Sequence, residues 1–278
     1  MSRRIIIIAE IGENHLGDME RARQMVIEAA SAGADIVKFQ SYAASDVADN
    51  DPEKEWFAKM QLSDEMHVEL KGLAESRGVE FLSAPFSLER ARFLCEELGL
   101  RKIKIASSEM LNFPLLDYVA ERAETVFLST GLADLDEVGR AVDRLARVPS
   151  VYLLHCVTAY PAPDEDANLR AIEALRRRFP DHPVGYSDHT LGIVAPVAAA
   201  GLGAAVIEKH FTLDKTLPGT DHILSVTPQE LREMVLMIRR VEQLLGSGVK
   251  RPAARELAVR EFVRGRFPKT GGRAGALR

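Results

Sequence analysis

The chain has 278 residues, of which 46% are hydrophobic, 28% charged and 6% aromatic, and its formal net charge is −5. This composition is typical of a soluble globular protein and excludes disorder, collagen and a disulfide scaffold. The acidic bulk argues against a nucleic-acid partner. The length suits a single α/β barrel domain of about 250 residues with a short extension.

Two apolar stretches need to be distinguished from export and membrane signals. Glu10 interrupts the N-terminal isoleucines before they reach the length of a secretory signal, so we expect no export. The stretch 191–207 contains three glycines and a proline, and Glu208 follows it, which indicates a helix, a turn and a strand. Cys95 and Cys156 lie in apolar surroundings without a neighbouring cysteine, which predicts reduced, buried thiols in a cytoplasmic protein.

The last thirty residues carry a charge opposite to that of the rest. Residues 249–278 hold nine Lys and Arg against Glu256 and Glu261, a charge of +7 that leaves −12 on residues 1–248. We therefore expect a barrel domain over 1–248 and a basic C-terminal tail over 249–278. The tail is either a docking segment or a solvated terminus.

Strand-like and helix-like segments alternate along the chain. The eight apolar, β-branched runs of strand length are 5–12, 35–40, 79–86, 102–107, 125–131, 151–157, 183–189 and 205–211. The clearest helical patterns between them are 19–33, 64–78, 87–99 and 134–148. This eightfold alternation predicts a (β/α)₈ TIM barrel of parallel strands. A doubly wound open sheet is the alternative, but EIGENHLGD stands where that fold has its Gly-rich turn.

Polar residues follow the carboxyl end of every predicted strand, which is where active sites of this fold lie. Side chains two residues apart share one face of a strand, so pairs such as Lys38 with Gln40 point together into the barrel mouth. The polar residues at these ends are Glu10, Lys38, Gln40, Ser83, Lys104, Ser107, Ser129, Thr130, His155, Thr158, Ser187, Asp188, His189, Glu208 and His210.

Two histidines end the last two predicted strands. His189 and His210 would stand on neighbouring strands of a barrel, close enough to share one ion. Two imidazoles with open positions for water or substrate oxygen suit a divalent transition metal that acts as a Lewis acid. The alternative is that each histidine only forms hydrogen bonds within the strand ends. Glu208 and Asp188 are candidates for ligand orientation or proton transfer.

Two lysines lie inside apolar strands, where their ammonium groups need an anion or a route to solvent. An anionic ligand would satisfy Lys38 and Lys104 together, and the alternatives are outward-facing lysines or a Schiff-base lysine. Hydroxyl groups at the same mouth would complete a phosphate or carboxylate cradle; they belong to Ser83, Ser107, Ser129, Thr158 and Ser187. The long segment after the last strand, with Asp221, is either a functional loop or a solvated Ω-loop.

Seven segments of the chain follow one another in the order and spacing of a known family. They are EIGENHLGD, GADIVKFQSY, KIASSEM, FLSTGLADLDEV, HCVTAYPAP, GYSDHTLG and EKHFTLDKTLPGTDH. From about residue 5 to 245 the chain resembles the N-acetylneuraminate (sialic acid) synthases. The resemblance implies an enzyme that condenses phosphoenolpyruvate with an open-chain aldose, typically N-acetylmannosamine or its 6-phosphate. The products would be a 2-keto-3-deoxy nonulosonic acid and phosphate.

The resemblance also implies roles for individual residues. His189 and His210 match the family's manganese ligands, with Mg²⁺ and Co²⁺ as alternative ions. The residues that match phosphoenolpyruvate contacts are Lys38, Lys104, Ser107, Ser129 and Ser187. Those that match the sugar side are Glu10, Gln40, Tyr160, Glu208 and Asp221. From both lines of reasoning we expect the catalytic residues to be Glu10, Lys38, Glu208 and Asp221. The sequence departs from the family at Thr158, where Asn or Ser is commoner.

Full-length members of this family continue into a C-terminal antifreeze-like domain that reaches across a dimer and gives an arginine to the substrate's N-acyl group. We expect this chain to lack that domain, its tail to be a remnant of the linker, and the enzyme to be a cytoplasmic homodimer without a membrane partner. Two other functions stay open. One is a 3-deoxy-ulosonate-phosphate synthase that acts on a phosphorylated aldose, and the other is a barrel that binds a sugar without turnover.

Overall fold

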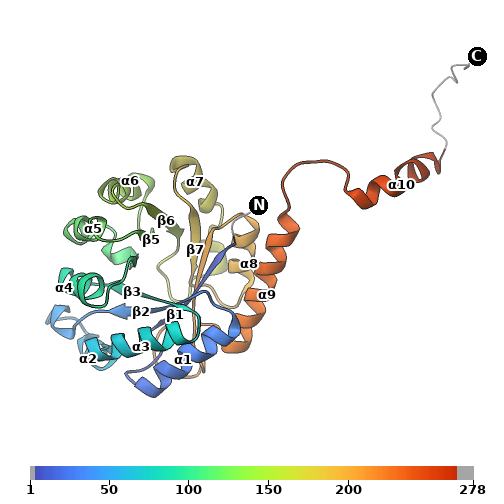
Figure 1. The fold of residues 1–278 in the computed structure, drawn as a ribbon. Coiled ribbons are helices and arrows are strands. Elements are labelled where there is room, and N and C mark those ends of the chain that lie inside the picture. The colour runs from blue at the N-terminus through green and yellow to red at the C-terminus, as the bar shows by residue number, and fades with distance from the viewer. Residues whose placement is uncertain (1–3, 268–278) are drawn as a thin grey trace, which may run out of the picture. The chain divides into compact units, whose positions relative to one another are not determined.

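The computed structural model describes residues 4–267. Eight parallel strands alternate with helices and curl into a barrel that the helices surround (Figure 1), which confirms the predicted TIM barrel. The strands are β1 (Ile6–Gly12), β2 (Ile36–Ser41), β3 (Glu80–Pro85), β4 (Lys102–Ile105), β5 (Thr125–Ser129), β6 (Ser150–His155), β7 (Val184–Asp188) and β8 (Val206–His210).

A helix stands in every connection between consecutive strands, with two helices after β2, and a further helix follows β8. They are α1 (Met19–Ala32), α2 (Lys54–Met60), α3 (Asp64–Ser76), α4 (Leu88–Arg92), α5 (Phe113–Ala120), α6 (Leu135–Arg144), α7 (Ala171–Arg178), α8 (Val194–Gly201) and α9 (Pro228–Leu245). A π-helical turn, η2 (Phe93–Glu97), continues α4, and short 3₁₀ turns are η1 (Ala44–Asp46), η3 (Ser107–Glu109) and η4 (Asp164–Asp166).

Local signals in the sequence explain where the helices begin and end. The Asp18 carboxylate accepts hydrogen bonds from two backbone N–H groups of the first turn of α1, and Gly33 ends that helix in the left-handed conformation. Asp134 and Glu137 form a capping box at the start of α6. These caps satisfy backbone groups that a helix end would otherwise leave without partners.

Backbone hydrogen bonds join the strands in the order β3-β2-β1-β8-β7-β6-β5-β4. The two outermost strands of this order, β3 and β4, lie side by side, but within the described residues no backbone ladder joins them. The ladder between β1 and β8 runs from Ile6 opposite Val206 to Glu10 opposite His210. It brings together residues that are about two hundred positions apart in the chain.

Strand alternation divides the core into two layers. One face of the strands packs against the helices, as Ile7, Val37 and Phe39 do. The other face points into the barrel and forms a small apolar cluster of Ile8, Ile36, Leu82, Phe127, Tyr152, Leu154 and Val206. Two residues further along the same inward faces stand Glu10 and Lys38, so a buried polar layer covers this apolar floor.

The chain divides into two units. Residues 4–245 belong to the barrel, and residues 246–267 belong to a second unit that contains α10 (Ala254–Gly265). The remainder of the predicted basic tail, 268–278, lies outside the described residues. Cys95 and Cys156 are free and buried. Within residues 4–267, no helix has both the length and the hydropathy to cross a membrane.

Candidate active site

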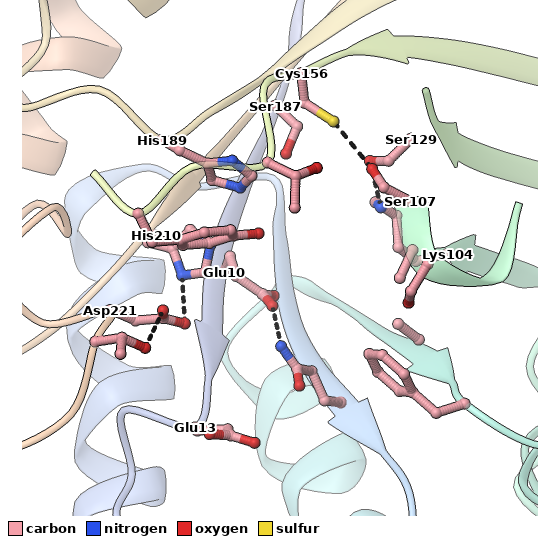
Figure 2. Close-up of a pocket in the computed structure, with 18 of the residues that line it drawn as sticks. Glu10, Glu13, Lys104, Ser107, Ser129, Cys156, Ser187, His189, His210 and Asp221 are labelled. Carbon is pink, nitrogen blue, oxygen red and sulfur yellow. Dashed lines mark hydrogen bonds and ion pairs between the residues drawn. The ribbon is translucent and has the colours of Figure 1, made fainter. Parts of the chain in front are cut away.

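A pocket of about 760 Å³ opens at the carboxyl ends of the strands (Figure 2). In Figure 2, Ser107, Ser129 and Lys104 lie on one side of the pocket, and His189 and His210 lie on the other. The predicted site residues that line it are Glu10, Lys38, Gln40, Lys104, Ser107, Ser129, Thr158, Tyr160, Ser187, His189, Glu208, His210 and Asp221.

Ser83 is a predicted site residue that the structure places elsewhere. It is fully buried, it does not line the pocket, and its Oγ has no hydrogen-bond partner among the described residues. Its register partner on β2 is Phe39, which packs toward the helices, whereas the next residue of β3, Ala84, lines the pocket. The prediction rested on proximity to the strand end, and the alternation along β3 turns this side chain outward.

Asp188 is directed away from the pocket for the same reason. It forms a buried ion pair with Lys209, whose Nζ donates to Asp188 Oδ2 at 2.6 Å. The hydroxyl of Tyr186 donates to Asp188 Oδ1 at 2.9 Å. Asp188 therefore ties β7 to β8 behind the pocket, and the predicted role in orienting a ligand or moving a proton does not suit its position.

Strand register brings Glu10, Lys38 and Glu208 together. Glu10 stands opposite Lys38 on one side and opposite His210 on the other. The Lys38 Nζ lies 3.2 Å from Glu10 Oε2 and 3.2 Å from Glu208 Oε1. Although burial lowers the pKa of Lys38, the two carboxylates outweigh it and raise that pKa.

Lys104 has weaker anionic support than Lys38. Its Nζ donates to Ser129 Oγ at 2.6 Å and to the carbonyl oxygen of Ile105 at 3.0 Å, while Glu208 Oε1 is 3.9 Å away. Burial therefore dominates and lowers the pKa of Lys104 to about 8. The two lysines thus differ. Carboxylates of the protein already pair with Lys38, whereas Lys104 is the ammonium group that an incoming anion would stabilise most.

The pKa values of the two central carboxyl groups are shifted in opposite directions. Burial raises the pKa of Glu10. Burial also acts on Glu208, but Lys104, Lys38 and the hydrogen bond donated by the Ser187 hydroxyl at 2.8 Å outweigh it and lower its pKa to about 2. Neighbouring carboxyl groups whose pKa values diverge are typical of sites that divide proton transfer from charge stabilisation.

The histidine pair stands at the ends of β7 and β8. The ring centroids of His189 and His210 are 5.3 Å apart, and the ring of Tyr160 lies 4.2 Å from that of His189. His189 Nδ1 donates to the carbonyl oxygen of Val157 at 2.6 Å, and His210 Nδ1 lies 3.2 Å from Asp221 Oδ2. Burial, with His210 nearby, lowers the pKa of His189 to about 4, so this ring is neutral near pH 7.

These contacts are compatible with metal binding by both histidines. A ligating imidazole commonly donates its second N–H to a carbonyl or carboxylate, as the Nδ1 of His189 does here, and the Nδ1 of His210 lies beside the Asp221 carboxylate. This leaves both Nε2 atoms for a metal. Within residues 4–267, no cluster of three or more His, Cys, Asp or Glu side chains is arranged to hold an ion. A metal at this place would therefore have His189 and His210 as its protein ligands, with water or substrate filling the remaining positions.

A cluster of hydroxyl and thiol groups lies beside Lys104. The Ser107 hydroxyl accepts from the backbone N–H of Gly131 at 3.1 Å and lies 3.2 Å from Cys156 Sγ. A Cβ on Gly131 would overlap Thr158 Oγ1 and would lie 2.8 Å from Ser107 Oγ. Only glycine leaves these groups free to approach one another. Neither Gly131 nor Cys156 is among the site residues predicted from the sequence.

The outer part of the pocket is formed by residues that the sequence analysis missed. They are Glu13, Glu53, Trp56 and Phe57, and three of them come from α2 or from the N-cap residue directly before it. One available signal was that Trp56 is the only tryptophan in the chain. The other was the position of Glu13 within EIGENHLGD, directly after the first strand.

Comparisons with known proteins agree with this fold. The family model described as the NeuB family matches residues 25–250. The chain is 42% identical to the N,N'-diacetyllegionaminic acid synthase of Legionella pneumophila, over 93% of this chain and 78% of that protein. It is 36% identical to the N-acetylneuraminate-9-phosphate synthase of Mus musculus, over 92% of this chain and 75% of that protein.

A solved structure shows the same architecture. It is that of an N-acetylneuraminic acid (sialic acid) synthetase from Leptospira borgpetersenii in complex with citrate. It superimposes with a TM-score of 0.89 at 36% identity and covers 95% of this chain and 93% of its own.

Proposed function

The chain belongs to the NeuB family and is a synthase, and on that premise we propose that it condenses phosphoenolpyruvate with an open-chain aldose to give a 2-keto-3-deoxy sugar acid and phosphate. One observation carries this proposal. A lysine and serine cradle, a pair of carboxyl groups with divergent pKa values and a pair of histidines line a single pocket. Condensation of an anionic enol with an aldehyde needs these three kinds of group side by side.

The cradle suits the anionic substrate. Lys104, with its lowered pKa and only a distant carboxylate, would gain a close anion from phosphoenolpyruvate. Ser107 and Ser129 line the same pocket and supply hydroxyl donors, whereas the Ser187 hydroxyl already donates to Glu208. Charge-assisted hydrogen bonds from these groups would hold the phosphate and the carboxylate and orient C3 of the substrate.

The carboxyl pair suits the bond-making steps. C3 of phosphoenolpyruvate forms a bond to the aldehyde carbon, and the aldehyde oxygen takes up a proton. Water then adds to C2 and releases one proton. The bond between C2 and the phosphate oxygen breaks with its electrons going to phosphate, and the new C2 hydroxyl releases its proton to give the ketone. Glu10, whose pKa is raised, can hold and deliver a proton, whereas Glu208 stays ionised and stabilises the positive charge that develops at C2.

The histidines suit the acceptor aldehyde. A divalent ion on His189 and His210, for which we propose Mn²⁺ ahead of Mg²⁺ and Co²⁺, would supply Lewis acidity at the aldehyde oxygen. The protein's own contribution is to fix both rings through Val157 and Asp221. Calorimetric titration with Mn²⁺ of protein stripped of metal by a chelator tests the metal site. We expect the wild type to bind Mn²⁺ and His210→Ala to abolish that binding. Equal binding by the variant would contradict the assignment.

Phosphate release tests the reaction. Purified protein with phosphoenolpyruvate and Mn²⁺ should release phosphate only when an aldose is added. The aldose panel includes N-acetylmannosamine, its 6-phosphate and unacetylated sugars. Release without an aldose, or none with any aldose, would contradict the proposed reaction. The second result would favour a barrel that binds a sugar without turnover.

We further propose that the enzyme is a homodimer whose basic tail contributes to the acceptor side. The support is the charge of +7 on residues 249–278 against −12 on the rest. Each exposed ion pair between the tail and an acidic surface contributes about 1 kcal/mol or less to the binding free energy. Truncation after Gly248 should raise the KM for the acceptor selectively or reduce the mass found by light scattering. No change in either would leave the tail without this role.

A further inference from the structure

Two loops build the outer rim of the pocket. One is the connection between β2 and α3, which contains α2 and places Trp56 and Phe57 on the pocket wall. The other follows β8 and contributes Gly219 and Asp221. A Cβ on Gly219 would lie 3.2 Å from Trp56 Cζ2, so the second loop packs directly against the indole ring.

Glu13 fixes this rim to the barrel. The Tyr42 hydroxyl donates to Glu13 Oε1 at 2.8 Å, and the Trp56 indole N–H donates to Glu13 Oε2 at 2.6 Å. Glu13 directly follows β1, Tyr42 directly follows β2, and Trp56 lies in α2. The Glu13 carboxylate therefore connects three segments of the chain. These hydrogen bonds give the Trp56 ring a defined position on the pocket wall.

The rim carries acidic side chains, whereas the buried floor of the pocket carries the lysines. Glu13, Glu53 and Asp221 line the rim, whereas the ammonium groups of the pocket, Lys38 and Lys104, lie buried beside Glu208. Among the described residues, no arginine lines the pocket. Once phosphoenolpyruvate occupies the lysines, a phosphate on the acceptor would meet carboxylates without a free cation.

We infer that the acceptor is an aldose without a phosphate group, held at the rim by hydroxyl or amide donors to the carboxylates and by packing of its C–H face on Trp56. This inference rests on the proposed function and adds the substrate class. A phosphorylated aldose is disfavoured by the acidic rim, so Glu13, Glu53 and Asp221 determine specificity. The 3-deoxy-ulosonate-phosphate synthase considered from the sequence would need a cationic rim, which these residues do not supply.

A charge reversal at the rim tests the inference. Glu53 is exposed at the start of α2, lines the pocket and makes no side-chain cap, so Glu53→Lys should preserve the fold. Glu55→Lys makes the same charge change two residues away on an exposed position that does not line the pocket, and it is the matched control.

For the wild type, kcat/KM should be higher with N-acetylmannosamine than with its 6-phosphate. Glu53→Lys should raise kcat/KM for the 6-phosphate relative to the free sugar by about tenfold, and Glu55→Lys should leave the ratio unchanged. A wild-type preference for the 6-phosphate, or an equal change in both variants, would overturn the inference while leaving the proposed reaction intact.

Fluorescence gives a readout that does not depend on turnover. Because Trp56 is the only tryptophan, its emission reports directly on the rim. With phosphoenolpyruvate bound, N-acetylmannosamine should change the emission in a saturable way, and its 6-phosphate should do so only at much higher concentration. Tighter binding of the 6-phosphate would refute the inference even if no phosphate were released. The absence of release with every acceptor would count against the proposed function alone.

Discussion

Replacing each pocket lysine by methionine should shift stability in opposite directions. Lys38 contacts two buried carboxylates at 3.2 Å, whereas Lys104 has one carboxylate at 3.9 Å. Methionine matches the length of lysine and suits an apolar environment. Lys104→Met should therefore stabilise the free enzyme, and Lys38→Met should destabilise it.

The magnitudes follow from the site. Burial lowers the pKa of Lys104 from 10.5 to about 8, so keeping it charged at neutral pH costs about 3 kcal/mol. Loss of its hydrogen bonds offsets part of this, so Lys104→Met should raise the free energy of unfolding by about 1–3 kcal/mol. Lys38→Met leaves buried carboxylates without their cation and should lower the free energy of unfolding by about 3–5 kcal/mol.

Thermal and denaturant unfolding without substrate measure these changes. For a chain of this size, about 1 kcal/mol corresponds to a change in melting temperature of about 2–4 °C. Native Lys104 loses its proton above pH 8 while the unfolded lysine keeps it until about 10.5, so wild-type stability gains from this group as the pH rises through that window. The advantage of Lys104→Met should therefore shrink between pH 8 and 10.5.

Activity separates this prediction from a purely structural role. Loss of a charge-assisted hydrogen bond should raise the KM of Lys104→Met for phosphoenolpyruvate by about 10- to 100-fold, with a much smaller effect on the acceptor. A fall in melting temperature in both variants would refute the prediction that the buried charge of Lys104 destabilises the free enzyme. A borohydride-trappable imine on either lysine would refute anion binding.

Three other predictions concern the surroundings of the site. Gly131→Ala should raise the KM for phosphoenolpyruvate at least about tenfold, because the added methyl group overlaps Thr158 Oγ1; steady-state kinetics with an unchanged KM would contradict this. Asp188→Asn should lower the free energy of unfolding by about 3 kcal/mol, since Lys209 would be buried without its carboxylate, and denaturant titration measures the loss. In the wild type, kcat/KM for phosphoenolpyruvate should fall above pH 8 as Lys104 loses its proton, and a flat profile through pH 9.5 would exclude that role.

The sequence predicted the fold because its signals are local and repeated. Apolar runs of strand length, periodic helices and caps such as Asp18 each depend on neighbouring residues, and eight repetitions define a barrel. Most of the pocket lining could be predicted as well, since the carboxyl ends of parallel strands meet at one mouth. Ser83 was misplaced because position at a strand end does not tell which face a side chain takes, although its parity with Phe39 could have done so.

The remaining parts of the site depend on long-range contacts. The opposite pKa shifts of Lys38 and Lys104 arise from their distances to Glu10 and Glu208, which no spacing in the sequence reveals. The rim depends on Glu13 meeting Trp56, forty-three residues away in the chain. That contact depends on how the connection after β2 folds over the barrel, and irregular connections carry little periodic signal.

The missing ladder between β3 and β4 has a consequence for how the barrel assembles. The strands form a three-stranded piece, β1 to β3, and a five-stranded piece, β4 to β8, and backbone hydrogen bonds join the pieces only between β1 and β8 within the described residues. Each piece contains local pairings, whereas the joining ladder spans most of the chain and closes the largest loop. Glu10 and His210 face each other across that ladder. We therefore expect the carboxyl group and the imidazole to meet, and a competent site to form, only when the two pieces dock.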